Sequence, residues 1–163
     1  MRTPTSLPSW RAESAGASGY TQTSAVGCTG TIAIGETKTC TITNDDIAPK
    51  LTLTKTVVND NGGTLTQADF PSFVDGVAQA WDAVTPVTAN ALHVASETPH
   101  AGYTASVWGG DCAADGKITL LPGDDKTCTI TNDDVAPKLT LKKTVVNDNG
   151  GNKVVSDFPL FIS

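Results

Sequence analysis

Apolar and polar residues alternate along two stretches of the chain. Residues 51–58 read Leu-Thr-Leu-Thr-Lys-Thr-Val-Val, and residues 127–132 read Thr-Cys-Thr-Ile-Thr-Asn. An alternation of period two is typical of a β-strand with one buried face and one face in water. Each stretch also carries one polar residue in phase with its apolar residues, Lys55 in the first and Asn132 in the second. We therefore predict two strands that each turn a polar side chain toward the core.

Weaker alternation and short apolar runs predict the remaining strands near 38–44, 70–74, 79–84, 91–96, 103–108 and 117–121. Turn signals separate them. The stretch 59–63 contains an Asn-Gly pair suited to a tight hairpin, and Asp75-Gly76 and 122–125 are further turns. Nothing in the sequence shows a sustained helical period. Short strands at regular spacing with turns between them indicate an all-β sandwich.

The sequence repeats itself at an offset of 88 residues. The stretch 40–63, which starts Cys-Thr-Ile-Thr-Asn-Asp-Asp, returns almost unchanged as 128–151. Self-similarity at a fixed period indicates an array of one structural unit, and this period is that of a small domain. We predict one complete unit at 47–134, the C-terminal part of a preceding unit at 1–46, and the N-terminal strands of a following unit at 135–163.

Charge and hydropathy exclude several function classes. The net charge of −6 and pI near 4.6 give no electrostatic basis for binding nucleic acid or an anionic membrane surface. No apolar run approaches the roughly 18–20 residues of a membrane-spanning helix. Residues 1–10 lack the apolar core of a signal peptide, so we expect no export signal within this chain.

The cysteines indicate an oxidising environment. The chain has four, and Cys40 and Cys128 occupy the same position in the repeat. Four cysteines allow three pairings, but only pairing within each repeat can be used by every copy. We predict disulfides Cys28–Cys40 and Cys112–Cys128, and hence an extracellular or cell-surface location. The alternative, a zinc site, lacks a CxxC motif and a nearby histidine, and no cofactor is expected.

Lys55 and Asn132 suggest a self-cross-linking reaction. Burial makes a lone lysine neutral, and a neutral amine is a nucleophile. Beside an asparagine amide, with a carboxylic acid to move protons, it can displace ammonia and leave an amide bond. The acid candidate is Glu97, whose alternation phase is that of His93 and Ala95.

Other interpretations of these residues remain open at this point. Lys55 can be a lysine whose amine reaches water near a strand end, and Asn132 can open a turn. Calcium can bind at 59–61 and 132–134, although neither has the usual calcium-loop pattern. His93 and His100 have no partner pattern and are expected at the surface. No motif of a turnover enzyme is present, so we expect a non-enzymatic protein.

Three elements of the sequence resemble a known family, namely the lysine in Leu-Thr-Leu-Thr-Lys55, the Glu97–Tyr103 element and the closing Thr-Ile-Thr-Asn132. The family is that of the B-type repeat (CnaB) domains of Gram-positive surface proteins and pilins, specifically the SpaA-like prealbumin-type repeats. The resemblance covers residues 19–163. It implies an immunoglobulin-like prealbumin fold and an intramolecular isopeptide bond between Lys55 and Asn132, promoted by Glu97. It also implies a structural role in a bacterial stalk, adhesin or filament. The alternative is a module of the cell surface that binds a glycan or a host protein, which an exposed aromatic cluster at Trp81 and Trp108 would favour.

The terminal segments suggest a second cross-link, between chains. The segment 135–163 would supply opening strands and 1–46 closing strands, so the tail of one copy can complete the head of the next. Lys143 would then bond Asn44 of a neighbouring copy, with Glu13 as the acid, and the contact would propagate as a filament. The alternative is a section taken from a longer array.

Overall fold

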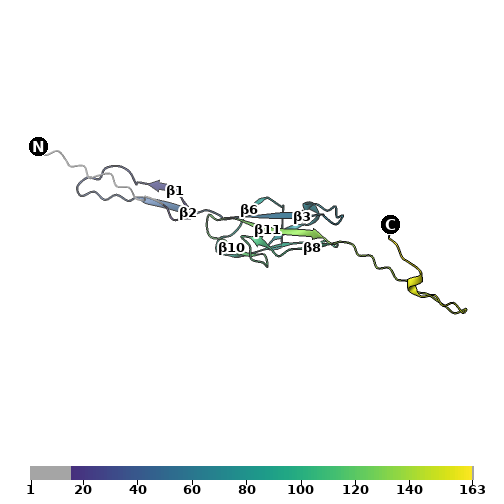
Figure 1. The fold of residues 1–163 in the computed structure, drawn as a ribbon. Helices are drawn as coiled ribbons and strands as arrows, with labels where there is room; N and C mark the ends of the chain where they lie inside the picture. The colour runs from purple at the N-terminus through teal and green to yellow at the C-terminus, as the bar shows by residue number, and fades with distance from the viewer. Residues whose placement is uncertain (1–15, 163) are drawn as a thin grey trace.

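The computed structural model describes residues 16–162 as a central sandwich between two slender segments (Figure 1). On one side lies the hairpin of β1 (Tyr20–Val26) and β2 (Thr41–Asp46). On the other side, the chain leaves the sandwich and includes one 3₁₀ turn, η2 (Val155–Asp157). Strands dominate the described residues, which confirms the all-β prediction. The division into repeat units stays a prediction.

The sandwich consists of two sheets. The first has the order β6 (Val84–Pro86), β3 (Lys50–Val58), β11 (Asp125–Asp134) and β8 (Tyr103–Ala105), with β9 (Gly109–Gly110) also paired to β11. The second has the order β10 (Lys117–Thr119), β7 (Leu92–Glu97), β4 (Ser72–Val74) and β5 (Val77–Gln79). All pairings are antiparallel except that of β3 with β11, the first and last strands of the sandwich, which run parallel over nine residue pairs.

The core lies between the sheets and follows the predicted alternation. Leu51 and Leu53 on β3 are almost fully buried, as are Cys128 and Ile130 on β11, whereas the threonines between them face outward. The facing sheet contributes further apolar side chains, namely Val74, Ala95 and Ile118. Burial of these side chains is the main favourable contribution to folding.

Two predicted turns have different outcomes. Asp75 and Gly76 both have positive φ, 52° and 78°, and form the two-residue turn between β4 and β5. The tight hairpin predicted at 59–63 is wrong. Strand β3 pairs with β6 and β11, so the loop after it crosses through η1 (Gln67–Asp69) to the other sheet.

The predicted strand 79–84 is two separate strands, β5 and β6. Asp82 between them has a φ of 60°, and its N–H donates to the carbonyl of Leu53 at 2.8 Å. A residue in the left-handed region cannot continue a strand, so the chain changes sheets here. Strand β8 also ends earlier than predicted, at Ala105, and β11 begins earlier, at Asp125.

Both predicted disulfides are present. Cys112–Cys128 joins a loop to β11 and lies in the core of the sandwich. Cys28–Cys40 closes the loop of the β1–β2 hairpin. Disulfides persist in oxidising compartments, so this pairing supports the expected extracellular setting.

Candidate functional site

Lys55 is buried between the sheets. Its side chain has no exposed area, and Nζ lies 4.2 Å from the ring centre of Phe70 and 5.2 Å from that of Trp81. The interpretation of Lys55 as a lysine that reaches water is therefore wrong. Burial lowers the pKa of Lys55, and the hydrogen bond and negative charge of Glu97 only partly oppose this shift.

Glu97 meets Lys55 from the opposite sheet. It ends β7, its side chain is 7 % exposed, and its Oε2 accepts a hydrogen bond from Lys55 Nζ. On β7 the inward face carries His93 and Ala95, while Leu92 is exposed. Glu97 continues this inward face, and its alternation phase is therefore the one that reaches Lys55.

Asn132 completes the group from β11. In the parallel register Lys55 lies opposite Ile130, and Asn132 lies opposite Val57. Lys55 and Asn132 are thus diagonal neighbours on the same face of adjacent strands, a spacing that long side chains bridge. Asn132 is 1 % exposed and lies inside a strand, so its interpretation as a turn-former is wrong.

Two buried oxygens at this site lack a hydrogen-bond partner among the described residues, Oε1 of Glu97 and Oδ1 of Asn132. An unpaired buried polar atom costs on the order of 1–3 kcal/mol, so native structures rarely leave one. Both atoms are acceptors when Glu97 is ionised, whereas a protonated Glu97 carries a donor. Neither oxygen can therefore satisfy the other while both act only as acceptors.

Sequence reasoning missed the aromatic rings that enclose Lys55. Phe70 is fully buried, and its carbonyl accepts the indole N–H of Trp81 at 2.7 Å. The missed signal is the triplet Asp-Phe-Pro at 69–71, which recurs at 157–159. Trp81 also stacks on Trp108, with ring centres 6.4 Å apart, and both are half-buried against the core. This pair is therefore not the exposed aromatic cluster that would favour ligand display.

The residues predicted for a link between chains are not brought together within one chain. Asn44 lies on β2, on one side of the sandwich, and Lys143 lies in the segment beyond the other side (Figure 1). Nζ of Lys143 lies 4.6 Å from the ring centre of Phe158, which repeats the contact of Lys55 with Phe70. Glu13 lies outside the described residues.

The surface prediction for His93 is wrong. His93 is buried, with Nδ1 2.7 Å from a carboxylate oxygen of Asp75 and Nε2 2.8 Å from the carbonyl of Thr88. Burial tends to lower the pKa of His93, but these two partners outweigh it and raise the pKa above its ordinary value. His93 thus supports the β4–β5 turn, away from Lys55.

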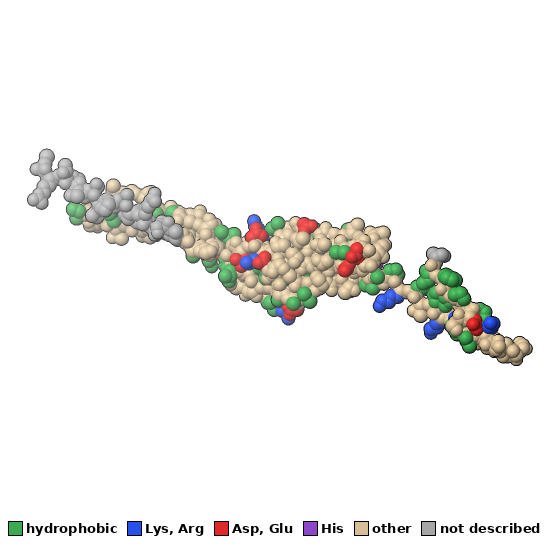
Figure 2. Space-filling model, in the orientation of Figure 1, with side chains coloured by type: hydrophobic (Ala, Val, Ile, Leu, Met, Phe, Trp, Pro, Cys, Tyr) green, Lys and Arg blue, Asp and Glu red, His purple; other side chains and the backbone are tan. Residues whose placement is uncertain are grey.

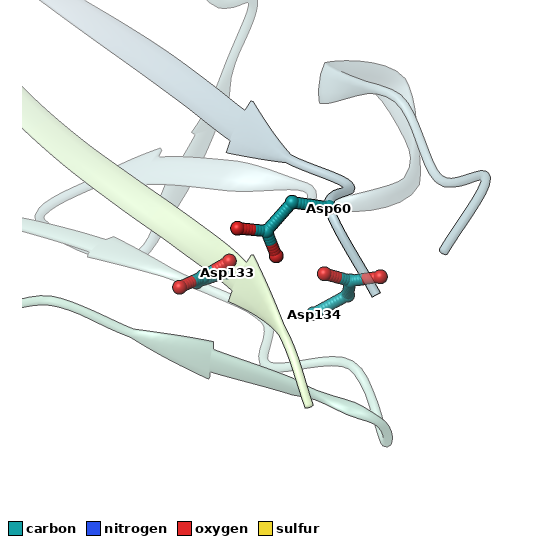
Figure 3. A group of neighbouring side chains, drawn as sticks. All are labelled: Asp60, Asp133 and Asp134. Carbon is teal, nitrogen blue, oxygen red and sulfur yellow. The ribbon is translucent and has the colours of Figure 1, made fainter. Parts of the chain in front are cut away.

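Three carboxylates gather where β3 and β11 end, those of Asp60, Asp133 and Asp134 (Figure 3). Asp134 already accepts the backbone N–H groups of Asn61 at 3.0 Å and of Gly63. Burial tends to raise the pKa of Asp134, but these donors outweigh it and hold the pKa below its ordinary value. Asp134 thus fastens the loop after β3 to the end of β11, which replaces the predicted hairpin.

Comparison with known proteins identifies one family. Residues 46–130 match the sequence model of a SpaA family described as a prealbumin-like fold domain. The match includes Lys55 and Glu97 and ends just before Asn132. Neither a curated protein nor a solved structure matches the chain. Among residues 16–162, no helix is long and apolar enough to cross a membrane.

Proposed function

The chain belongs to the SpaA family of prealbumin-like fold domains, and from this premise we propose that it is a structural section of an extracellular stalk, adhesin or filament, closed by a self-formed bond between Lys55 and Asn132. The family and the two disulfides support a surface pilin-type module. The observation that carries the cross-link is the burial of an amine, a carboxyl group and an amide in one water-poor site.

The reaction needs one internal proton transfer before it starts. Moving a proton from the Lys55 ammonium to Glu97 leaves a neutral amine and a neutral acid. The depressed pKa of Lys55 favours this transfer, because burial disfavours the charged amine. The proton on Glu97 also gives the unpaired Asn132 Oδ1 a donor and polarises the amide carbonyl.

The bonds then balance without a co-reactant. The Lys55 nitrogen attacks Cγ of Asn132 and forms a C–N bond, giving a tetrahedral carbon. Glu97 delivers its proton to the amide nitrogen of Asn132 and then takes one from the attacking nitrogen. The bond between Cγ and that nitrogen breaks, and ammonia leaves. The product is one amide between the two side chains, and Glu97 is left as the neutral acid, holding a proton that began on the Lys55 ammonium.

Intact mass of the reduced, denatured chain tests the cross-link. We expect the wild-type chain to be lighter than its sequence by one ammonia, and a protease digest to contain one branched peptide holding Lys55 and Asn132. Glu97→Gln and Lys55→Arg should restore the full mass. Lys143→Arg is the matched control, because Lys143 occupies the same repeat position as Lys55, and it should keep the loss. A folded wild-type chain at its full calculated mass would contradict the proposal.

Exposed apolar side chains favour a second candidate, head-to-tail assembly. Figure 2 shows hydrophobic side chains gathered on the segment beyond the sandwich. Leu139 and Leu141 are 69 % and 45 % exposed, whereas Leu51 and Leu53, at the same repeat positions, are buried. A strand of another copy, equivalent to β11, would bury them, and β2 carries that sequence.

A denaturing, reducing gel tests this assembly. If Lys143 of one copy bonds Asn44 of another, a ladder survives heat and reductant and loses one ammonia for each junction. Lys143→Arg should abolish the ladder without restoring the ammonia lost inside each chain. A single band at every concentration, with a monomeric species by light scattering, would contradict head-to-tail assembly.

A further inference from the structure

The β1–β2 hairpin and the sandwich are joined through the backbone of Ile47. Its N–H donates to the carbonyl of Gly19 at 2.8 Å, and its carbonyl accepts the N–H of Gly123 at 2.7 Å. Gly19 precedes β1, and Gly123 lies in the loop between β10 and β11. One linker residue is therefore hydrogen-bonded to the segment before it and to the sandwich after it.

The same place holds a close contact that leaves no room for side chains. A Cβ added to Gly19 would lie 2.1 Å from the carbonyl oxygen of Pro122, and a Cβ added to Gly123 would lie 2.9 Å from Cα of Gly19. Separations below about 3 Å do not occur between such atoms. Both glycines also have a φ near +80°, which other residues rarely adopt. The two backbones thus pack directly against each other.

The linker after Ile47 is held as well. Pro49 is fully buried, and its carbonyl accepts the N–H of Val87 at 3.0 Å. The N–H of Lys50 donates to the carbonyl of Asp124 at 2.8 Å. A proline also fixes its own φ and restricts the residue before it. Ile47, Pro49 and Lys50 are therefore each hydrogen-bonded to residues outside the linker.

The other end of the sandwich repeats one contact of this arrangement, the hydrogen bond between the linker and the glycine of the Gly-Tyr turn. The N–H of Val135 donates to the carbonyl of Gly102 at 2.9 Å, as Ile47 does to Gly19. The φ of Gly102, +85°, is close to the +79° of Gly19, but no described atom lies within 4 Å of its added Cβ. Gly102-Tyr-Thr and Gly19-Tyr-Thr are the same motif. Gly102 thus offers the surface that Gly19 offers to Pro122.

We propose that the Pro122-Gly123 loop is a docking surface for the Gly-Tyr turn of the preceding unit, and that this glycine-to-glycine contact holds successive units in one fixed orientation. The array then behaves as a stiff rod, with Gly102 as the receiving surface for the same loop of a following unit. The contact lies away from Lys55, Glu97 and Asn132, so this proposal can be tested independently of the cross-link.

Residual dipolar couplings of the 163-residue chain test the proposal, with Gly19→Ala and Gly102→Ala as a matched pair. Both substitutions place an alanine at the same motif position with a similar positive φ, but only the alanine at position 19 would meet Pro122. In the wild type, amides of β1–β2 and of the sandwich should fit one alignment tensor. Gly19→Ala should reduce the hairpin couplings about twofold or more, since averaging over orientations shrinks them. Gly102→Ala should leave them unchanged.

A second pair decides the case if Gly19→Ala unfolds the hairpin. Gly123→Ala approaches the contact from the sandwich, and Gly76→Ala is its control, with a φ of +78° and nothing within 4 Å. Gly123→Ala should uncouple the hairpin, and Gly76→Ala should not. Separate tensors in the wild type, or equal effects within both pairs, would overturn the proposal. The ammonia loss is measured on the same samples and should not change in any variant.

Discussion

Two stretches of nearly the same sequence differ in secondary structure and burial in this molecule. Residues 50–58 and 138–146 differ only at Thr54 and Lys142. The first forms the nine-residue strand β3, with its leucines buried. The second is not a strand, and its leucines are exposed. The difference is that β3 has β11 beside it and a second sheet across the core, so tertiary partners rather than local preference make this strand.

The loops that follow the two stretches, in contrast to the stretches themselves, make the same contacts as each other. The side-chain amide of Asn59 donates to the carbonyl of Leu65 at 2.9 Å, and Asn147 does the same to Lys153. Each loop then ends in a 3₁₀ turn, η1 or η2, whose aspartate accepts the N–H of the residue before the turn at 2.8 Å. These contacts span only a few residues, so they form with or without a sandwich. Turn chemistry is encoded locally, and the strand is not.

The cross-link gives the largest expected contrast between the two copies. Lys55→Met should remove the proposed bond to Asn132 and lower the free energy of unfolding by on the order of 4 kcal/mol, because such a bond would close a loop of 77 residues. Lys143→Met should leave unfolding of the sandwich unchanged. Denaturant titration followed by tryptophan fluorescence measures both. Equal stability of the two variants would mean that the copies do not differ in this way.

The leucines give a contrast of packing. Leu53→Ala should lower the free energy of unfolding by about 3 kcal/mol, since it leaves a cavity in a buried site. Leu141→Ala, at the same repeat position, should change it by less than about 0.5 kcal/mol. Urea titration of both variants measures this. If Leu141→Ala were as costly, the segment 138–146 would be packed in solution, for example against another copy.

The aspartates that close the repeated motif give the smallest contrast, visible in acid. The pKa of Asp134 is lowered on folding, so its contribution to stability is present above its ordinary pKa of 3.8 and is lost as the pH falls through the folded value. Asp134→Asn should therefore weaken the sandwich at neutral pH and flatten its acid dependence below about pH 4. Asp46→Asn, at the same repeat position, should change neither the stability of the sandwich at neutral pH nor its dependence on acid. Thermal unfolding between pH 2 and 7 distinguishes the two.

Much of the fold follows from the sequence because the strongest patterns coincide with the central strands. The alternation of leucine and threonine marks β3, and that of Thr-Cys-Thr-Ile marks β11. The pattern does not reveal that these strands lie side by side and parallel, which depends on contacts across the length of the sandwich. The hairpin expected after β3 failed for the same reason, since Asp134, distant in sequence, holds that loop.

Part of the candidate site could also be predicted from the alternation of polar and apolar residues. Lys55 and Asn132 are polar residues in apolar phase, and burial of both follows from that phase. The burial of His93 does not, because its partners Asp75 and Thr88 come from a turn and a loop that only the folded chain brings close. The position of the Phe70 ring did not follow either, because the predicted strand 70–74 includes Phe70 whereas β4 begins only at Ser72.

The parallel pairing of β3 and β11 has a consequence for a protein under tension. The chain enters the sandwich at the start of β3 and leaves at the end of β11, at opposite ends of the same pair of strands (Figure 1). A pull on the two sides therefore slides one strand along the other and loads their hydrogen bonds together instead of one after another. With the proposed bond in place, the load would pass along residues 50–55, cross to Asn132 and leave through residues 133–134. Every other part of the sandwich would then be spared the strain.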